Sequence, residues 1–455
     1  MSLEQIKEAT GGTLVQGNWL GRIKGVSIDS RTIKKGDIFF AIKGDRFDGH
    51  QFIGQAITSG AYVIVASKPV SKEIKVPVIR VKDTTGALGD LASFYRDRFS
   101  IPVIAITGSC GKTTTKEILA DILGAKFKVL RNARSENNQF GVPLTLLKLK
   151  PSHDMAVLEF GTNQPGDIQR LAQIAKPTVS VLTNIGDSHL QKLKDRSGVF
   201  KEKYQLVRYM SPNGYVIFNH DDEWLRKIDT KKDHQKKITF AIHQKADYRA
   251  DHISILSRGN SQFYIRKNKF DLKSIAYHNV YNSLAAISCG FLFKVSLDQM
   301  ASRIRKFKFR NSRFETKNIG PLTVVNDTYN ANPLSLMSAV ETMNQMPARG
   351  KKILILGDML ELGKQSKRLH HQVGELIART SIQCVMTFGR DSEYITQSIR
   401  KNNDQMRAVH HASMNGLCQK LKGISQSGDV VLVKGSRAMR MERIVDFLEK
   451  NFFYP

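Results

Sequence analysis

The sequence predicts a three-domain α/β protein, and three observations support this prediction. The chain has 455 residues, and a typical domain has roughly 150. Short apolar runs alternate with helical stretches, a pattern that favours parallel sheets covered by helices. The hydrophobic fraction of 41% and the charged fraction of 24% are those of an ordinary globular protein that buries sizeable cores.

The charge balance is unusual, because 70 Lys and Arg against 41 Asp and Glu leave a net charge of +29. Such a field favours an anionic partner, such as a nucleic acid, a nucleotide, an acidic sugar or a membrane surface. Four scattered cysteines are too few for a disulfide framework or a zinc site, so we expect a reduced chain. We find no secretory signal and no apolar run of the ~18 residues that a spanning helix needs. We therefore expect a cytoplasmic protein.

Residues 1–84 are expected to form a small α/β domain. Apolar runs at 38–42, 61–66 and 76–81 indicate strands, and the Gly and Asp residues between them indicate turns.

Residues 85–313 are expected to form a central domain with a parallel sheet, because buried-strand runs recur between helical stretches. The expected strands are 103–107, 155–160, 179–183 and 215–219, and the expected helices include 112–123 and 165–175.

Residues 314–455 repeat this alternation and are expected to form a Rossmann-like α/β domain. The expected strands are 322–327, 353–357, 384–388 and 430–434, followed by an amphipathic helix at 440–450.

The basic excess is concentrated in two stretches. Residues 226–273 hold 13 Lys or Arg against 5 Asp or Glu, and residues 303–317 hold 7 against 1. Either stretch could bind a nucleic acid or an acidic surface, but we favour the simpler interpretation of solvated strand or helix faces.

The strongest motif is a phosphate-binding loop that follows the strand at 103–107. Its glycines, Gly108 and Gly111, let backbone N–H groups turn toward an anion at the start of a helix. Lys112 would reach the β- and γ-phosphates, and the Thr113 hydroxyl would bind magnesium. Cys110 is interpreted as a tolerated small residue rather than a nucleophile. The loop residues expected to contact the nucleotide are Thr107, Gly108, Ser109, Cys110, Gly111, Lys112, Thr113 and Thr114.

Two further residues are candidates for metal binding. Glu159 ends an apolar strand, and a carboxylate there, close to a phosphate loop, can hold magnesium. His189 follows the strand at 179–183, but magnesium prefers oxygen ligands, so its spacing alone indicates a structural histidine.

Taken together, the motifs resemble those of the Mur ligases, the ATP-dependent amide-bond-forming enzymes of peptidoglycan precursor synthesis. Within that family they are most similar to the member that adds D-alanyl-D-alanine to UDP-N-acetylmuramoyl-tripeptide. The matching segments are residues 29–31, 35–41, 48–50, 137–138, 141–147, 159–163, 184–190, 278–282, 327–333, 356–363 and 434–437.

This resemblance implies an activity for the protein and a function for each of its domains. The first domain would bind the UDP-sugar, the second ATP and Mg²⁺, and the third would complete the ligase. The tripeptide carboxylate would be phosphorylated by ATP, and D-alanyl-D-alanine would attack the acyl phosphate, releasing ADP and phosphate. The resemblance implies no nucleic-acid partner, and we expect a monomer.

The resemblance also assigns roles to single residues. His189 would be a ligand of a second metal, and Lys203 would be carbamoylated, so that its carbamate could bridge or help retain a metal. Lys203 or Lys201 could also be an ordinary solvated lysine. Lys112, Glu159, His189 and Lys203 would form the catalytic set. Asn279, Asn282, Arg313, Asp327, Tyr329 and Asn330 would contact the nucleotide. The expected substrate residues are Ser30, Arg31, Asp48, Gly49, His50, Asn137, Asn138, Asn332, Lys434, Ser436 and Arg437.

Two alternative functions remain open at this point. One is another amide ligase, either Mur-type or folylpolyglutamate-type, which the string at 329–333 disfavours. The other is a nucleic-acid-dependent ATPase, suggested by the charge, which would need translocase motifs that we do not find.

Overall fold

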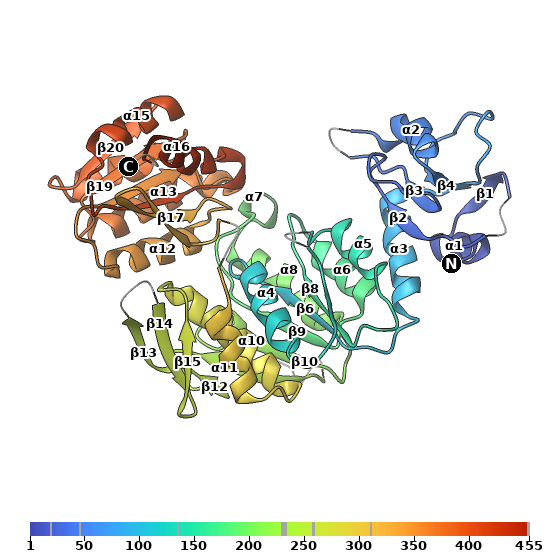
Figure 1. Ribbon diagram of the computed structural model, residues 1–455, viewed down its shortest axis with the longest axis horizontal. Coiled ribbons are helices and arrows are strands. Elements are labelled where there is room, and N and C mark those ends of the chain that lie inside the picture. The colour runs from blue at the N-terminus through green and yellow to red at the C-terminus, as the bar shows by residue number, and fades with distance from the viewer. Residues whose placement is uncertain are drawn as a thin grey trace.

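The computed structural model describes residues 1–18, 21–44, 47–133, 136–228, 234–256, 260–309 and 312–452. These residues form three lobes in chain order, with the N-terminal lobe (blue) and the C-terminal lobe (orange to red) standing apart on the central lobe (Figure 1). No described helix is long and apolar enough to cross a membrane.

The N-terminal lobe contains a five-stranded sheet in the order β1-β5-β4-β3-β2, in which only β1 is antiparallel to its neighbour. Side chains alternate along β3, so Ile38 and Phe40 pack on α1 and α3 while Phe39 packs on α2. The elements are α1 (Leu3–Thr10), β1 (Thr13–Gln16), β2 (Gly25–Ser27), β3 (Asp37–Phe40), η1 (Gly49–Phe52), α2 (Ile53–Thr58), β4 (Ala61–Ala66), β5 (Val78–Arg80) and α3 (Thr84–Arg96).

Helix α3 joins the first two lobes, because it packs on α1 and also on α5 and α6 of the central lobe (Figure 1). Its Arg96 donates a hydrogen bond of 3.2 Å to the carbonyl of Ala175, and its Asp90 forms a 2.6 Å ion pair with Arg170. A domain boundary near residue 84 therefore stays a prediction, since the helix that starts there belongs to both cores.

The central lobe contains a seven-stranded parallel sheet in the order β12-β11-β10-β9-β6-β8-β7. Ile104 and Ile106 face α4 and α10, whereas Val103 and Ala105 face α5 and α6, so both faces of the sheet are buried. The elements are β6 (Val103–Thr107), α4 (Lys112–Leu123), β7 (Val129–Arg131), α5 (Gly141–Leu146), β8 (Met155–Glu159), α6 (Asp167–Ala175), β9 (Val179–Leu182), α7 (Leu190–Leu193), α8 (Arg196–Arg208), β10 (Tyr215–Asn219), η2 (Leu225–Lys227), β11 (Lys236–Ala241), β12 (Tyr248–Arg249), α10 (Tyr277–Leu292) and α11 (Leu297–Lys306).

The predicted elements of this lobe are present, but three bounds differ. The strands expected at 155–160 and 179–183 end one residue earlier, at Glu159 and Leu182, and one helix begins later. The helix expected from residue 165 begins at Asp167, because Gly166 adopts a left-handed φ of 92° that a helix cannot continue. A separate antiparallel sheet, not predicted, inserts before α10 and consists of β13 (Asp251–Leu256), β14 (Asn260–Ile265) and β15 (Asn268–Leu272).

The C-terminal lobe contains a six-stranded sheet in the order β16-β17-β21-β18-β19-β20, parallel except for β16. Helices α12, α13 and α14 pack on one face and α15 and α16 on the other, as expected for a Rossmann-like domain. The elements are β16 (Glu315–Ile319), β17 (Leu322–Asp327), α12 (Pro333–Gln345), β18 (Lys352–Gly357), η4 (Gly363–Gln365), α13 (Ser366–Ala378), β19 (Cys384–Phe388), α14 (Glu393–Asn402), β20 (Arg407–His411), α15 (Met414–Ile424), β21 (Val430–Lys434), η5 (Arg437–Met439) and α16 (Glu442–Phe452).

The central and C-terminal lobes are docked on each other. Ile185 and Leu190 of the central lobe belong to the same buried apolar cluster as Leu336 and Leu362 of the C-terminal lobe. The chain passes between the lobes at Ser312 and Phe314, both of which have a φ of 55°. The carboxyl ends of the central strands therefore face the C-terminal lobe across a shared interface.

Candidate active site between the central and C-terminal lobes

The phosphate loop connects β6 to α4 and depends on two glycines. Gly108 and Gly111 have φ of 154° and 81°, a region that other residues rarely adopt. A Cβ atom would collide with Thr183 Oγ1 at Gly108 and with Asn282 Oδ1 at Gly111. Both positions therefore require glycine, for conformation and for space.

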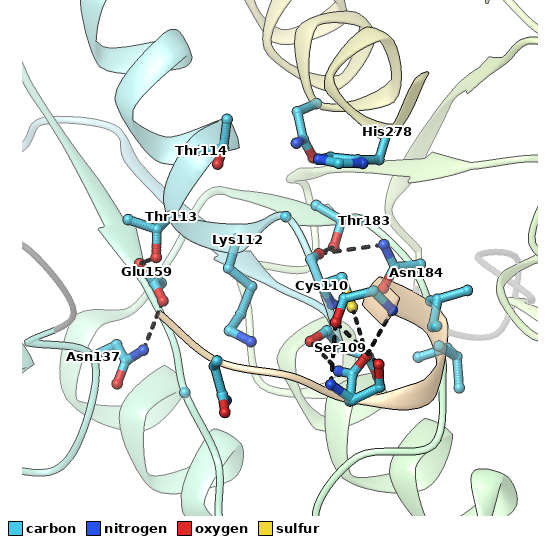
Figure 2. A pocket seen from close by; sticks show the side chains of 18 of the residues that line it. Ser109, Cys110, Lys112, Thr113, Thr114, Asn137, Glu159, Thr183, Asn184 and His278 are labelled. Carbon is cyan, nitrogen blue, oxygen red and sulfur yellow. Dashed lines mark hydrogen bonds between the residues drawn. The ribbon is translucent and has the colours of Figure 1, made fainter. Parts of the chain in front are cut away.

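Asn184 holds the loop from the end of the neighbouring strand β9. Its Oδ1 accepts a 2.8 Å hydrogen bond from the backbone N–H of Cys110, and its Nδ2 donates to the Cys110 carbonyl at 3.3 Å. The Thr183 hydroxyl donates to the same carbonyl at 2.6 Å (Figure 2). Neither residue was predicted to belong to the site, although Asn184 begins the matching segment 184–190. Both follow a strand of a parallel sheet at its carboxyl end, where functional side chains commonly lie.

Lys112 extends from the start of α4 into the space between Glu159 and the loop (Figure 2). Its Nζ donates a 2.8 Å hydrogen bond to the carbonyl of Gly108. Burial lowers the pKa of Lys112, because the ammonium has lost most of its hydration. A phosphate anion bound in the loop would add a negative charge beside this ammonium.

Glu159 is 1% exposed at the end of β8, and two side chains fix its carboxylate. Thr113 donates to Oε2 at 2.6 Å, and Asn137 donates to Oε1 at 2.6 Å (Figure 2). Asn132, which the sequence analysis also missed, accepts the Glu159 backbone N–H at 2.9 Å. Hydroxyl, carboxylate and amide oxygens thus meet beside the phosphate loop.

This set of donors fits magnesium better than a transition metal. Within the described ranges no group of three or more His, Cys, Asp or Glu side chains is arranged to hold a metal ion. Mg²⁺ does not require such a cage, because it commonly binds one or two carboxylates together with phosphate oxygens and water. Thr113 and Glu159 supply the protein oxygens for that arrangement.

His189 precedes α7 with a left-handed φ of 54° and lines the same cavity. Its Nδ1 lies 2.6 Å from Oε2 of Glu361 in the C-terminal lobe. This contact is an ion pair when the imidazole is protonated. Proximity to His189 lowers the pKa of the Glu361 carboxyl.

Lys203 lies on α8 and is 1% exposed, whereas Lys201 on the same helix is exposed. Burial, and next the positive charge of Lys112, place the pKa of Lys203 well below its usual value. The adjacent Glu202 is held by the start of α6, since its Oε1 accepts the Ile168 N–H at 2.8 Å.

Asn282 and Asn279 form an internal network rather than two free amides. Asn282 Oδ1 accepts from Thr115 at 3.2 Å, and its Nδ2 donates to Asn279 at 3.0 Å. Asn279 in turn donates to Ser274 at 2.9 Å. Asn282 reaches the cavity, but Asn279 is not among the described residues that line it. Contact of either amide with adenine stays a prediction.

A group of aromatic side chains, not anticipated from the sequence, lines the cavity beside this network. The rings of His243 and Tyr277 are stacked with centroids 6.1 Å apart. The Tyr281 hydroxyl donates to Asp221 at 2.7 Å. Burial lowers the pKa of the neighbouring His278 to about 4, so this imidazole is neutral at pH 7.

The C-terminal lobe contributes charged side chains that bind one another. The Lys434 Nζ lies 2.6 Å from Asp327 Oδ2 and donates to the Asn330 carbonyl at 3.0 Å. The Arg313 guanidinium lies 3.8 Å from the ring centroid of Tyr329.

Ser436 and Arg437 connect loops within the C-terminal lobe. The Ser436 hydroxyl accepts from the Leu360 N–H at 2.8 Å and donates to the Ala331 carbonyl at 3.3 Å. Arg437 forms a 3.1 Å ion pair with Glu442. Neither is among the described residues that line the cavity, so direct contact with substrate stays a prediction.

The cavity has a volume of about 940 Å³ and lies between the central and C-terminal lobes. Of the described residues that the sequence analysis singled out, the lining lacks Thr107, Gly108, Lys203, Asn279, Ser436, Arg437 and the N-terminal set. The predicted residues that line it are Ser109, Cys110, Gly111, Lys112, Thr113, Thr114, Asn137, Asn138, Glu159, His189, Asn282, Arg313, Asp327, Tyr329, Asn330, Asn332 and Lys434.

The predicted substrate residues of the N-terminal lobe form a separate group. His50 Nδ1 lies 2.6 Å from Asp48, and its Nε2 accepts the Ser67 N–H at 3.1 Å. Ser30 donates to Gln55 at 2.9 Å, and the exposed Arg31 pairs with Asp29 at 2.7 Å. A Cβ at Gly49 would meet the Ile42 backbone, so the turn before His50 requires glycine.

Of the described residues in the basic stretch at 226–273, Phe240 and His243 line the cavity and the others do not. Several of its cations lie over aromatic rings. Lys227 lies 3.7 Å from the Trp224 ring, and Arg266 lies 5.0 Å from the Tyr248 ring. Such contacts are typical of long cationic side chains on a solvated surface. They support the simpler interpretation of this stretch.

Comparison with known proteins gives matches along almost the whole chain. Residues 22–96 match the description "Mur ligase family, catalytic domain", residues 106–290 "Mur ligase middle domain", and residues 312–437 "Mur ligase, glutamate ligase domain". The chain is 34% identical to the UDP-N-acetylmuramoyl-tripeptide–D-alanyl-D-alanine ligase of Bacillus subtilis, covering 98% of each protein.

Two solved structures are similar over nearly their full length. The fold superposes on MurF from Acinetobacter baumannii with a TM-score of 0.89 at 28% identity, covering 99% of both chains. It superposes on MurF from Thermotoga maritima, solved in complex with ADP, with a TM-score of 0.84 at 29% identity, covering 94% of this chain and 97% of the other.

Proposed function

Because the chain belongs to the Mur ligase family, we propose that it joins D-alanyl-D-alanine to UDP-N-acetylmuramoyl-tripeptide in peptidoglycan precursor synthesis. It is an ATP-dependent ligase. One observation carries the proposal: the phosphate loop and Glu159 open into a cavity whose opposite wall is the C-terminal lobe. A cavity shared between two lobes can bring a nucleotide and a carboxylate substrate together.

The triphosphate of ATP would lie on the loop between Gly108 and Thr113. The loop geometry and the start of α4 favour an anion there, and Lys112 supplies a positive charge that burial has left poorly solvated. The nearby aromatic group of His243, Tyr277 and Tyr281 offers apolar surface for the nucleoside.

Mg²⁺ would be held by the Thr113 hydroxyl and the Glu159 carboxylate, and His189 would be a ligand of a second metal ion. When bound, the ion neutralises phosphate charge and so assists nucleophilic attack. Asn137 keeps the Glu159 carboxylate oriented through its 2.6 Å hydrogen bond.

We assign the carbamoylated position to Lys203 rather than Lys201. Only an uncharged amine adds to carbon dioxide, and Lys203 is the buried residue of the two, with a pKa well below its usual value. The product is an anion, which would be a favourable partner for the positive charge of Lys112.

The reaction needs two covalent steps. A carboxylate oxygen of the tripeptide attacks the γ-phosphorus of ATP and releases ADP, and the amine of D-alanyl-D-alanine then attacks the acyl carbon and releases phosphate and one proton. Water would hydrolyse the acyl phosphate, so the docked lobes protect it by limiting solvent access. Lys434 of the C-terminal lobe and Arg313 of the segment that joins the lobes both line the cavity, and they are our candidates for binding its negative charge.

The uridine nucleotide is assigned to the N-terminal lobe. Ser30, Arg31 and the turn at Asp48–His50 are the proposed contacts there. The ion pair of Asp48 with Lys68 and its 2.6 Å contact with His50 preorganise this turn. A substrate that extends from this lobe to the phosphate loop would span the space between them, which is consistent with a long UDP-sugar peptide.

The decisive experiment measures ADP release from UDP-N-acetylmuramoyl-tripeptide and D-alanyl-D-alanine, with the pentapeptide product confirmed by mass. Tripeptides ending in diaminopimelate and in lysine are compared. The control reactions replace the dipeptide with diaminopimelate, lysine or glutamate, and we expect no product from them. A further reaction offers the same single amino acids together with a shorter precursor. Efficient ligation in that reaction would contradict the proposal.

A further inference from the structure

The contact between His189 and Glu361 joins the central lobe to the C-terminal lobe at the edge of the cavity. The two residues are 172 positions apart, and their side-chain atoms Nδ1 and Oε2 lie 2.6 Å apart. A second contact reinforces the first, because the Gln191 N–H donates a 3.0 Å hydrogen bond to the Glu361 carbonyl. Glu361 therefore meets α7 through both its side chain and its backbone.

The backbone on both sides of this contact is held in an uncommon conformation. His189 and Glu361 have φ of 54° and 65°, in the left-handed region that a non-glycine residue adopts only at an energetic cost. Surrounding contacts must fix such residues. Gly363 packs against Gln191, where a Cβ would lie 3.2 Å from the Gln191 Cα.

The loop that carries Glu361 is fixed firmly to the C-terminal lobe. The Met359 N–H donates to His370 at 3.0 Å, and the Leu360 N–H donates to Ser436 at 2.8 Å. Met359 and Leu362 are buried in the apolar cluster that also contains Leu190 of α7. Glu361 thus moves with the C-terminal lobe, and it reaches His189 only when that lobe is docked on α7.

The two nitrogens of the His189 ring have different surroundings. Nδ1 is buried and faces Glu361, and it has no other partner among the described residues. Nε2, in contrast to Nδ1, is not a buried atom without a hydrogen-bond partner, and the His189 side chain lines the cavity. A carboxylate on one ring nitrogen commonly orients a metal-binding histidine and leaves its other nitrogen for the ion.

From this arrangement we propose that Glu361 is a positioning residue, which orients His189 toward the divalent cation only when the C-terminal lobe is docked. This inference rests on the cation role proposed above for His189. Its consequence is that docking strengthens the cation site, and by reciprocity that cation binding favours docking. Ser436, which binds the Leu360 N–H, would support the same loop.

The test measures Mn²⁺ binding to the full-length protein with ADP, from the electron paramagnetic resonance signal of free Mn²⁺. We expect Glu361→Ala to weaken Mn²⁺ binding by about tenfold or more, the usual effect of removing such a partner. Glu361→Gln, which keeps the shape but not the charge, should fall between this variant and the native protein. The control Glu375→Gln changes an exposed glutamate on α13 and should leave the affinity unchanged.

A double-mutant cycle with His189→Ala shows whether Glu361 acts through His189. We expect Glu361→Ala to have no further effect in the His189→Ala protein. An equal loss with and without His189, or a native affinity in Glu361→Ala, would overturn the inference. Because Mn²⁺ binding needs no turnover, this result is separate from the ligase assay, and absence of ligation with a normal cycle would contradict only the proposed function.

Discussion

The thiol of Cys110 donates a hydrogen bond of 3.2 Å to Oδ1 of Asn332, which joins the phosphate loop to a residue 222 positions later in the chain. The same Oδ1 accepts the Ser335 N–H at 2.9 Å and so caps α12, while Nδ2 donates to the Ser109 carbonyl at 3.3 Å. One amide side chain therefore serves as a helix cap and as a contact between two lobes.

The two roles of Asn332 can be separated by substitution. Asn332→Ala should lose both, with a cost of about 1 kcal/mol for the missing cap, whereas Asn332→Ser keeps a capping hydroxyl. We expect both variants to show weaker ATP binding, by about fivefold for a lost hydrogen bond, but only Asn332→Ala to show a lower melting temperature. Thermal unfolding and nucleotide titration measure the two effects. Native ATP binding in both variants would contradict a role for this contact.

Glu159→Gln tests the proposed magnesium site with little change in shape. Removing the carboxylate charge should lower ligation by about 100-fold or more, because the stabilisation of transferred phosphate depends on the bound ion. Stability should change little, since one of the contacts with Thr113 and Asn137 can be kept by the amide. Steady-state ADP release measures the change, and raised Mg²⁺ should restore part of the loss. Unchanged turnover would exclude Glu159 from the metal site.

Lys203→Met should abolish ligation and also change how stability depends on pH. The unfolded lysine stays protonated up to a pKa of about 10.4, whereas burial gives folded Lys203 a lower pKa. Between those two values the unfolded state binds more protons, so the stability of the native protein should rise with pH in this window. Lys203→Met has no amine at this position, so its stability should rise less steeply with pH in this window.

Thermal unfolding from pH 7 to pH 10 in carbonate-free buffer measures this difference. Lys201→Met is the matched control, because this lysine is exposed on the same helix, and it should keep native activity and the native slope. Parallel pH profiles for native protein and Lys203→Met would show that Lys203 is not an uncharged amine in the folded state.

The ion pair between Lys434 and Asp327 should matter for the stability of the C-terminal lobe. Their side chains are 2% and 13% exposed, so Lys434→Met leaves a largely buried carboxylate without its partner. Breaking a buried pair in this way typically costs ~3–5 kcal/mol. Adding Asp327→Asn to Lys434→Met should recover much of the lost stability. The melting temperatures of the single and the double variant measure this recovery. Similar values for the single and the double variant would contradict a stabilising pair.

Local patterns were enough to predict the main elements. The strand at 103–107, the glycine loop and the helix at 112–123 have the predicted bounds, because each follows from neighbouring residues alone. The amphipathic helix expected at 440–450 is present but runs from Glu442 to Phe452. The small sheet of β13–β15 was missed, because its strands are only partly buried and lack a continuous apolar run.

The sequence by itself determined the α/β class, the phosphate loop and the resemblance to the Mur ligases, because these depend on residue types at short, fixed spacings. Only the tertiary structure decided how distant groups meet. It placed Asn184 against Cys110, buried Lys203 while leaving Lys201 exposed, and brought Glu361 to His189. Burial and contacts across a lobe interface depend on the packing of the whole chain, and it is burial that changes the pKa of a lysine and docking that pairs a histidine with a carboxylate.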